Sequence, residues 1–388
     1  VASHRASFDD LPPVAAALGR GDETQVRRDT RMGLWLSIAF GLLAYPLFWW
    51  AQPILQGLGQ APDVSVLAGQ YLAVAGLGLV PALLVMVLKS YLAALGRTQV
   101  VLWVTVAAVP ANACLNWALI FGKWGAPELG IVGSAWATVI VQLLSLALLC
   151  LYAAWLPQLR RFALFSRFWR PDWPAMGRVF RIGWPMGLTG LAESGLFHAS
   201  ALMMGWIGTA ELAAHGIALE ITALTFMVHV GLSNAATVRT GRFEGAGDAS
   251  ALRRGARVAI GLSLAFAAAT VVLFLTLPGP MVALFLDPAD PQAPRIIAFG
   301  TLLLAMAALF QLADATQVMA LGLLAGLRDT RVPMIMASVS YWIVGIPASY
   351  VLAFPLGLGG AGLWLGLVVG LSLAAALLMA RFWRTAPR

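Results

Sequence analysis

The sequence predicts an all-α protein that crosses a membrane many times, built as two parallel-repeat helical bundles. Of the 388 residues, 60% are hydrophobic and only 11% are charged, whereas a soluble domain is roughly 25% charged. Apolar runs recur along the whole length, each close to the ~20 residues that cross a bilayer as a helix. A motif that occurs twice, once in each half, predicts the two bundles.

Ten membrane spans are expected, in chain order. They lie at 32–52, 68–90, 99–122, 131–156, 181–206, 212–238, 256–278, 293–325, 332–355 and 358–382. The run at 293–325 is longer than a bilayer requires, so we expect it to contain a break or to be strongly tilted.

Basic residues alternate from one connection to the next. Of the 25 Lys and Arg residues, 21 fall in every second connection and at the C-terminus, while the connections between them hold only Lys123. Because positively charged loops stay in the cytoplasm, we expect the C-terminus and the linker at 157–180 to be cytoplasmic. The net charge of +8 is therefore a topology signal, and nucleic-acid binding is not expected.

Cofactor and enzyme motifs are not found in the sequence. Cys114 and Cys150 both lie in apolar runs, so neither a disulfide framework nor a metal site is indicated. The sequence contains no phosphate-binding loop and no HExxH or GxSxG motif. An enzyme and a bound cofactor are therefore not expected, and any transport would be passive or driven by an ion gradient.

The repeated motif lies in polar segments. The stretch GRGDETQVRRDTRMGLWLS at 19–37 matches GAGDASALRRGARVAIGLS at 245–263 in 8 of 19 positions. Two weaker echoes follow, LAALGRTQV (92–100) with LAGLRDTRV (324–332), and LGIVG (129–133) with LGGAG (358–362). Since both copies of the first motif are on the predicted cytoplasmic side, the halves have the same orientation. A substrate site between such halves is a recurring transporter plan.

Three acidic residues lie within spans: Glu193, Glu220 and Asp314. A carboxylate in the membrane is costly and therefore rare without a partner or a task. Exchange of a proton or Na⁺ is one such task. The alternative is a structural carboxylate that neighbouring donors satisfy, and His198 and Gln317 are the candidates.

The buried polar residues of the first half are neutral. Asn112 and Asn116 are four residues apart and share one helix face, and Thr138 follows in the next span. By themselves such residues favour hydrogen bonds between helices. Three histidines, His198, His215 and His229, are too scattered for a metal site.

The chain resembles the MATE (multidrug and toxic compound extrusion) family, on its NorM-like side, over residues 13–382. The segments that carry the resemblance are GRGDETQVRR, NACLNWALIFGKWGAPELGIVGSAWAT, FRIGWPMGL, AAHGIAL, TFMVHVGLSNAATVRTG, GAGD, LFQLADATQVMALGLLAGLRDTRVPM and YWIVGIPASY. Members are similar in having two six-helix bundles that expel organic cations in exchange for Na⁺ or H⁺.

The resemblance implies roles for several residues. Glu193 and Asp314 match the acids of a cation site in the C-lobe. Asn112, Asn116 and Thr138 match polar residues of a cation site in the N-lobe. The candidate residues of a substrate cleft are Phe310, Gln317 and Glu220.

Three positions depart from the family pattern. Phe310 stands where the family often has Tyr, Glu220 where a neutral amide is common, and His229 where Pro is common. The absent hydroxyl at Phe310 puts one Na⁺ ligand or cation–π contact of the family's site in question.

The early position of the first motif predicts a shortened N-lobe. The second motif follows 64 residues of the C-lobe, whereas only 18 residues precede the first. We therefore expect the chain to lack the first helix of its family and most of the second. The expected domains are an atypical N-terminus at 1–18, an incomplete N-lobe at 19–157, a cytoplasmic linker at 158–180, a C-lobe at 181–382 and a cytoplasmic tail at 383–388.

The favoured hypothesis is a monomeric antiporter of the bacterial inner membrane, which exports cationic amphiphilic compounds by exchange with Na⁺ or H⁺. One alternative is a truncated fragment that does not transport. Another is a flippase for lipid-linked precursors, whose cleft would need several basic residues to hold pyrophosphate. Lys89 is the one candidate for that task.

Overall fold

The computed structural model describes residues 17–387, apart from 21, 58–61, 157–158, 160–163, 165–167 and 288–290. Most of the atypical N-terminus expected at 1–18, and part of the linker expected at 158–180, lie outside these residues. The described elements are helices of the following bounds: α2 Glu23–Trp49, α3 Ala51–Gly57, α4 Pro62–Leu77, α5 Leu79–Ala94, α6 Thr98–Phe121, η1 Lys123–Gly125, α7 Gly130–Trp155, α9 Trp173–Ile207, α10 Thr209–Ala246, α11 Ala249–Thr276, α12 Pro278–Ala283, α13 Ala293–Gly326, α14 Arg331–Ser338, η2 Val339–Gly345, α15 Ile346–Ala353 and α16 Gly359–Thr385.

Every expected span falls on a helix or on consecutive helices. In the described part of the chain, eight helical stretches are long and apolar enough to cross a membrane, and the pair α4–α5, bent by 40°, makes a ninth. The tenth expected span lies on α9, a helix of 35 residues that is not among the eight. The all-α fold class is confirmed. Its physical reason is that lipid offers the backbone no hydrogen-bond partners, whereas a helix satisfies its own backbone groups.

Of the two alternatives for 293–325, the break is wrong, because α13 runs unbroken for 34 residues, and the strong tilt stays a prediction. An irregular turn occurs instead in the next span. There α14 and α15 are joined by a π-helical turn, η2, at Val339–Gly345. Such turns are rare and are frequent at functional sites.

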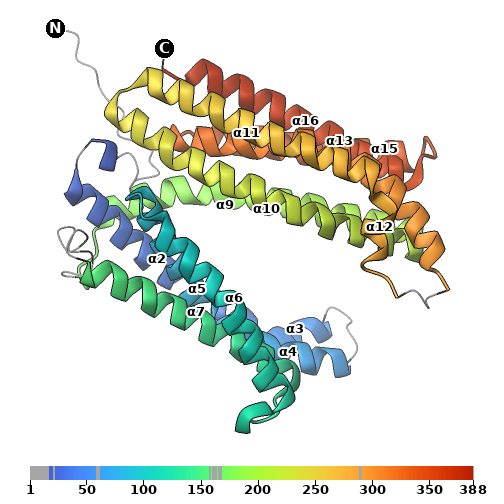
Figure 1. Cartoon of the computed structure of the whole chain (residues 1–388), viewed down its shortest axis with the longest axis horizontal. Helices are drawn as coiled ribbons and strands as arrows, with labels where there is room; N and C mark the ends of the chain where they lie inside the picture. The colour runs from blue at the N-terminus through green and yellow to red at the C-terminus, as the bar shows by residue number, and fades with distance from the viewer. Residues whose placement is uncertain are drawn as a thin grey trace. The chain divides into compact units, whose positions relative to one another are not determined.

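The described residues divide into two compact units, with the boundary between Phe180 and Arg181. Each unit is a bundle of long helices, blue to green in the N-terminal unit and green to red in the C-terminal unit (Figure 1). Helix α9 begins before the boundary and ends in the C-terminal unit.

The repeated motif is a helix N-cap in both units. The carboxylate of Asp22 accepts from the backbone N–H of Gln25, and that of Asp248 from Ala251, each at 2.9 Å. The two aspartates have nearly the same backbone angles, φ −88° and −91°, with ψ 84° in both. An aspartate in this position satisfies a free donor of the first helical turn, which accounts for its recurrence in GxGD.

The second echo, between 92–100 and 324–332, also has matching backbone geometry. Helix α5 ends with Arg97 N–H donating to the Leu92 carbonyl at 2.8 Å, and α13 ends with Asp329 donating to Leu324 at 3.0 Å. The residue before each donor has a positive φ, 77° at Gly96 and 71° at Arg328. This pattern is a Schellman C-cap, and it shows that the second echo is a structural repeat.

Small residues allow the central helices of the C-terminal unit to pack closely. A Cβ added at Gly322 would overlap the Ser233 side chain of α10. The hydroxyls of Ser233 and Thr237 donate across this contact to the Val318 and Gly322 carbonyls, each at 2.8 Å. Small residues and side-chain hydrogen bonds of this kind drive helix association in lipid.

Polar contacts in the N-terminal unit join α2 to the residues just before α9. Arg28 forms an ion pair with Asp172, and Trp35 Nε1 donates to the Phe168 carbonyl at 2.9 Å. The hydrogen bond from Arg28 holds the pKa of Asp172 below its ordinary value.

Candidate functional site

A chain of hydrogen bonds links three helices of the C-terminal unit. Gln317, on α13, donates from Nε2 to Glu193 Oε1 on α9 at 2.8 Å. Its carbonyl oxygen accepts from the hydroxyl of Tyr341, on the π-helical turn η2. Gln317 and Tyr341 are fully buried, at 0% exposure. The amide therefore uses both of its ends to hold a carboxylate and a phenol in fixed positions.

Asp314 lies one turn before Gln317 on α13 and is 1% exposed. Its Oδ1 atom has no hydrogen-bond partner among the described residues. A buried carboxylate oxygen without a donor carries a large desolvation cost, which a proton or a bound cation would relieve. Asp314 and Glu193, predicted from sequence as a pair, are thus both tied to the neighbourhood of Gln317.

Gln311 is a further buried amide on α13, at 0% exposure. Its side chain meets the Thr225 hydroxyl of α10 at 3.2 Å, while that hydroxyl also lies 2.8 Å from the Thr222 carbonyl. A hydroxyl has one proton to donate, and the shorter contact to Thr222 takes it. Thr225 must then accept, so the Gln311 atom facing it is the NH₂ group.

The assignment of the Gln311 amide has a consequence for the site. Oxygen and nitrogen of an amide are placed from the hydrogen-bond network. With NH₂ toward Thr225, the carbonyl oxygen takes the buried end of the amide, which has no partner among the described residues. Gln311 and Asp314, at i and i+3, share one helix face, so this face carries two buried acceptor oxygens without donors.

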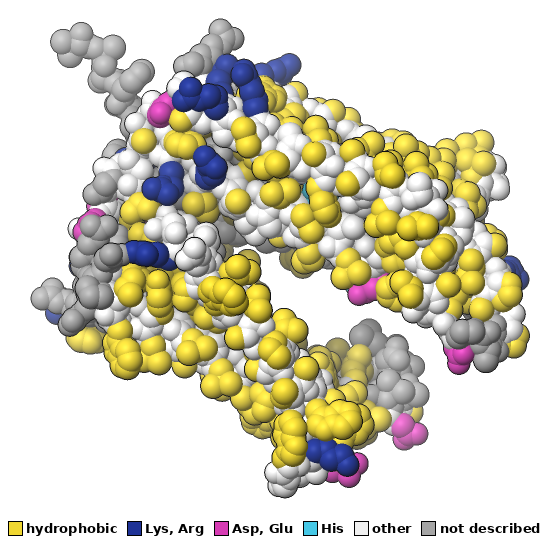
Figure 2. All heavy atoms as spheres, viewed as in Figure 1, with side chains coloured by type: hydrophobic (Ala, Val, Ile, Leu, Met, Phe, Trp, Pro, Cys, Tyr) yellow, Lys and Arg dark blue, Asp and Glu magenta, His cyan; other side chains and the backbone are white. Residues whose placement is uncertain are grey.

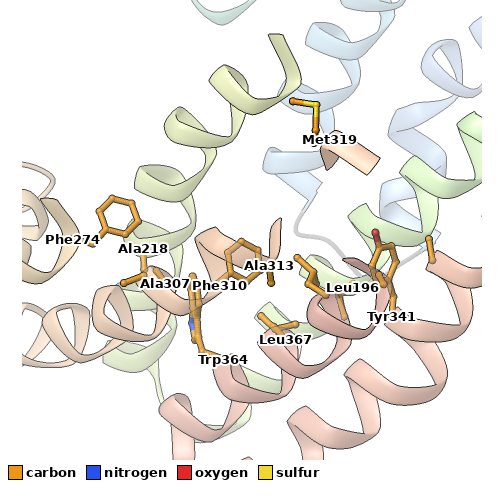
Figure 3. Close-up of a cluster of buried hydrophobic side chains, with 14 of the residues drawn as sticks. Leu196, Ala218, Phe274, Ala307, Phe310, Ala313, Met319, Tyr341, Trp364 and Leu367 are labelled. Carbon is orange, nitrogen blue, oxygen red and sulfur yellow. The ribbon is translucent and has the colours of Figure 1, made fainter. Parts of the chain in front are cut away.

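Aromatic side chains form the apolar wall around this face. Phe310 is buried at 1% exposure and packs edge-on against Phe197 at 6.0 Å and Trp364 at 5.6 Å between ring centroids. Figure 3 shows Phe310 between Trp364 and Leu196, with Tyr341 beyond Leu196. Phe310 therefore acts as a packing residue. The phenol that the family often has at this position is absent, and the phenol near this site belongs to Tyr341, on a different helix.

The first-half residues come together only in part. Asn116 Nδ2 donates to Asn112 Oδ1 at 2.9 Å on α6, and Asn116 Oδ1 is buried without a partner among the described residues. Thr138 is exposed and donates to the Ser134 carbonyl of its own helix, α7, at 3.1 Å. The asparagine pair thus has one unsatisfied acceptor, whereas the Thr138 hydroxyl is satisfied locally.

Glu220, the remaining candidate acid, is exposed on α10. It lies five residues before Thr225 on that helix, and no contact in the C-terminal unit buries it. An exposed carboxylate in an apolar helix is available to a cationic ligand.

Two histidines, His215 and His229, are buried between helices, whereas His198 is exposed and contacts the Ser194 carbonyl of its own helix. Trp364 Nε1 donates to His215 Nδ1 at 3.1 Å, and His215 Nε2 lies 3.2 Å from the Ser200 hydroxyl. Since Nδ1 accepts, the His215 ring is neutral with its proton on Nε2. His229 Nδ1 meets the Ser263 hydroxyl at 2.9 Å. Among the described residues, no cluster of three or more His, Cys, Asp or Glu side chains forms a candidate metal site.

Tyr341 and Gln311 were not among the residues predicted from sequence. Tyr341 occurs in the YWIVGIPASY segment, and a phenol in a span was a signal that could have identified it. Gln311 directly precedes LADATQ, and its spacing of three from Asp314 was the corresponding signal.

Together, the repeat of two helical bundles and the paired carboxylates of the second define a polytopic membrane protein with a polar site inside one bundle. Comparison with known families gives the particular class. The MatE family model matches residues 12–118 and 185–351, and the chain belongs to this family. The chain's relatives are named as multidrug resistance proteins, and its membership of this family makes it a transport protein and not an enzyme.

Named relatives are similar over nearly the whole chain. A probable multidrug resistance protein NorM of Rhizobium meliloti is 47% identical over 96% of this chain and 80% of the relative. Its counterpart from Agrobacterium fabrum is 44% identical over the same shares. A crystal structure of MATE in complex with MaL6 has the same fold, with a TM-score of 0.85 and 20% identity over 96% of this chain and 83% of that one. The NorM-like resemblance is confirmed.

The expectation that the chain lacks two helices is not supported by these comparisons. The relatives align to 96% of this chain, so only a small part of it has no counterpart in them. That expectation came from the early position of the first motif and from the family resemblance, which implies twelve helices where the sequence predicts ten spans.

Proposed function

We propose that the protein is an antiporter that exports cationic amphiphilic compounds in exchange for H⁺ or Na⁺. The observation that carries this proposal is the pair of carboxylates, Glu193 and Asp314, around the buried Gln317, with one Asp314 oxygen lacking a donor. The relatives named as multidrug resistance proteins support the choice of organic compounds as cargo.

The mechanism follows from the cost of charge in the bundle. When the site is closed to water, an ionised Asp314 with an unpartnered oxygen is unfavourable, so the closed state favours a bound proton or Na⁺. Gln311 and Asp314 would then contribute oxygens, and Gln317 would hold Glu193 in place. Alternating access in repeat transporters moves such a site from one side to the other.

The proposed setting is the bacterial inner membrane, with a cytoplasmic C-terminus and a monomeric chain. The alternation of basic connections supports this orientation. It is tested by attaching a reporter that is active only in the cytoplasm after Arg388. Activity is expected, and a silent reporter at normal expression would reverse the topology.

The coupling role is tested in proteoliposomes that contain the purified chain and ethidium as the probe. An imposed pH gradient or Na⁺ gradient should drive ethidium movement in the native protein. Asp314→Asn, which cannot exchange a charge, is expected to abolish the gradient-driven component. Glu128→Gln serves as the control, since Glu128 is an exposed acid in the connection after η1.

Two results would overturn the proposal. Gradient-driven transport that persists in Asp314→Asn would remove the carboxylate from coupling. A native protein that binds ethidium but moves none under either gradient would contradict antiport altogether.

Glu220 is proposed to select cationic cargo, because it is the exposed carboxylate of α10. In Glu220→Gln, transport of ethidium should weaken roughly 10-fold, while transport of a neutral dye of similar size should be unchanged. Equal losses for both dyes would assign Glu220 a structural role.

A further inference from the structure

A groove lies between α10 and α11 in the C-terminal unit, apart from the carboxylate site. It encloses about 90 Å³, and its walls include Leu232, Ala236, Phe243, Val258 and Leu262. Its polar lining residues are Arg239 and Thr240. The groove is thus apolar along its length with a single charged group.

The helix geometry gives the length of this groove and its distance from the end of α10. Arg239 lies seven residues before the end of α10 at Ala246, which is about 10 Å along the helix axis. Leu232 lies a further seven residues in the opposite direction, so the apolar walls extend about 10 Å beyond Arg239. Polar headgroups and the upper acyl chains of a bilayer occupy distances of this size.

Positive charge gathers at the same end of the two helices. Arg242 and Arg257 are exposed there in addition to Arg239, and Figure 2 shows dark blue side chains over the end of the bundle where α10 leads into α11. The guanidinium of Arg239 lies 5.8 Å from the centroid of the Phe243 ring, which keeps it at the groove.

The acids of this end are occupied elsewhere. Glu244 forms an ion pair with Arg328, and Asp248 caps α11 by accepting from Ala251 N–H. No ion pair of Arg239 is found among the described residues. The charge at the head of the groove is therefore available to an anion.

A glycine opens the groove on the α11 side. Gly255 lines it, and a Cβ added there would reach only ordinary contact with the Phe243 ring, at 3.4 Å. The absence of a side chain at this position leaves room for an acyl chain beside Phe243.

We infer that this groove binds one acidic phospholipid. The headgroup phosphate would pair with Arg239, and one acyl chain would lie along the apolar walls toward Leu232 and Leu262. Basic pockets between transmembrane helices are known to take anionic headgroups. The combination of a cationic head and an apolar channel fits a lipid better than a soluble anion, which would leave the channel unfilled.

The inference is tested by native mass spectrometry of the purified chain. The probes are nanodiscs of phosphatidylcholine alone, and nanodiscs with one quarter phosphatidylglycerol. The native chain is expected to retain one phosphatidylglycerol after the disc is removed. Arg239→Gln should reduce this retention about 10-fold, and Gly255→Leu, which fills the channel, should do the same.

Matched variants separate the groove from general charge and from helix changes. Arg384→Gln removes an exposed arginine of α16, and Gly261→Leu changes an exposed glycine elsewhere on α11, where a Cβ would meet nothing within 4 Å. Both should retain the lipid as the native chain does. Circular dichroism of all four variants checks that each one is folded.

Several outcomes would overturn the inference. Equal retention of phosphatidylcholine would remove the role of charge. Unchanged retention in Arg239→Gln would mean that this arginine only anchors the helix end at the interface. A dimer that Gly255→Leu disrupts would show that a second copy, and not a lipid, occupies the groove.

Discussion

Replacing Gln317 by leucine should remove two buried hydrogen bonds at once. Gln317 is fully buried, and it donates to Glu193 while accepting from Tyr341. A leucine can do neither, so a carboxylate and a phenol each lose a partner inside the bundle.

The magnitude follows from these two losses. A buried polar group left without a partner costs about 1–3 kcal/mol, which gives about 2–6 kcal/mol for both. The added apolar surface of leucine offsets about 1–2 kcal/mol. The free energy of unfolding should therefore fall by about 0–5 kcal/mol, with a central value of about 2–3 kcal/mol.

A double-mutant cycle with Tyr341→Phe isolates the bond between the two side chains. Once the phenol hydroxyl is absent, Gln317→Leu leaves only Glu193 without its donor. The effects of the two substitutions should therefore fail to add by about 1–3 kcal/mol, as expected for residues in contact. Tyr350→Phe is the control, since Tyr350 is 49% exposed.

The assay is equilibrium unfolding of the purified protein in mixed detergent micelles, followed by tryptophan fluorescence. Additivity of Gln317→Leu and Tyr341→Phe within about 0.5 kcal/mol would refute the reasoning. It would mean that the amide does not couple α13 to the π-helical turn.

Three other predictions concern packing, capping and pH, and each is measured by the same unfolding assay. Gly322→Ala should destabilise by about 1–3 kcal/mol through overpacking against α10, whereas Gly216→Ala, where a Cβ meets nothing within 4 Å, should be neutral or stabilising; equal effects would contradict the close approach. Asp248→Ala should cost about 0.5–2 kcal/mol by loss of the N-cap, and an unchanged stability would contradict the capping role. The hydrogen bond from Arg28 lowers the pKa of Asp172 in the folded chain. The advantage of the native chain over Asp172→Asn should therefore be complete above about pH 5 and decline as the pH falls further. An advantage that grows on acidification would have the wrong sign.

The sequence by itself determined the class, the spans and the internal repeat. Length and hydropathy suffice for the spans, because a chain in lipid must satisfy its own backbone and the helix does so locally. The repeat could be identified because its structure is also determined locally. Its motifs are helix ends, such as the Asp22 and Asp248 caps, whose geometry depends on residues within a few positions.

Because charges inside spans are few, the sequence also singled out Glu193, Glu220 and Asp314, and the family resemblance joined Glu193 and Asp314 as the acids of one site. It did not determine how each helix is rotated. A helix that is apolar on all sides has no pattern that marks its buried face. The sequence therefore could not show that Thr138 is exposed on α7 while Asn116 is half-buried on α6.

Only the tertiary structure brought Tyr341 to Gln317 and Gln311 to Thr225. The π-helical turn at Val339–Gly345 changes the helical register, and with it the direction of every side chain nearby. The turn packs against α16 and is tied to α13 by the hydrogen bond from Tyr341 to Gln317. Contacts between helices distant in sequence, and the hydrogen bonds they permit, therefore decided the composition of the site.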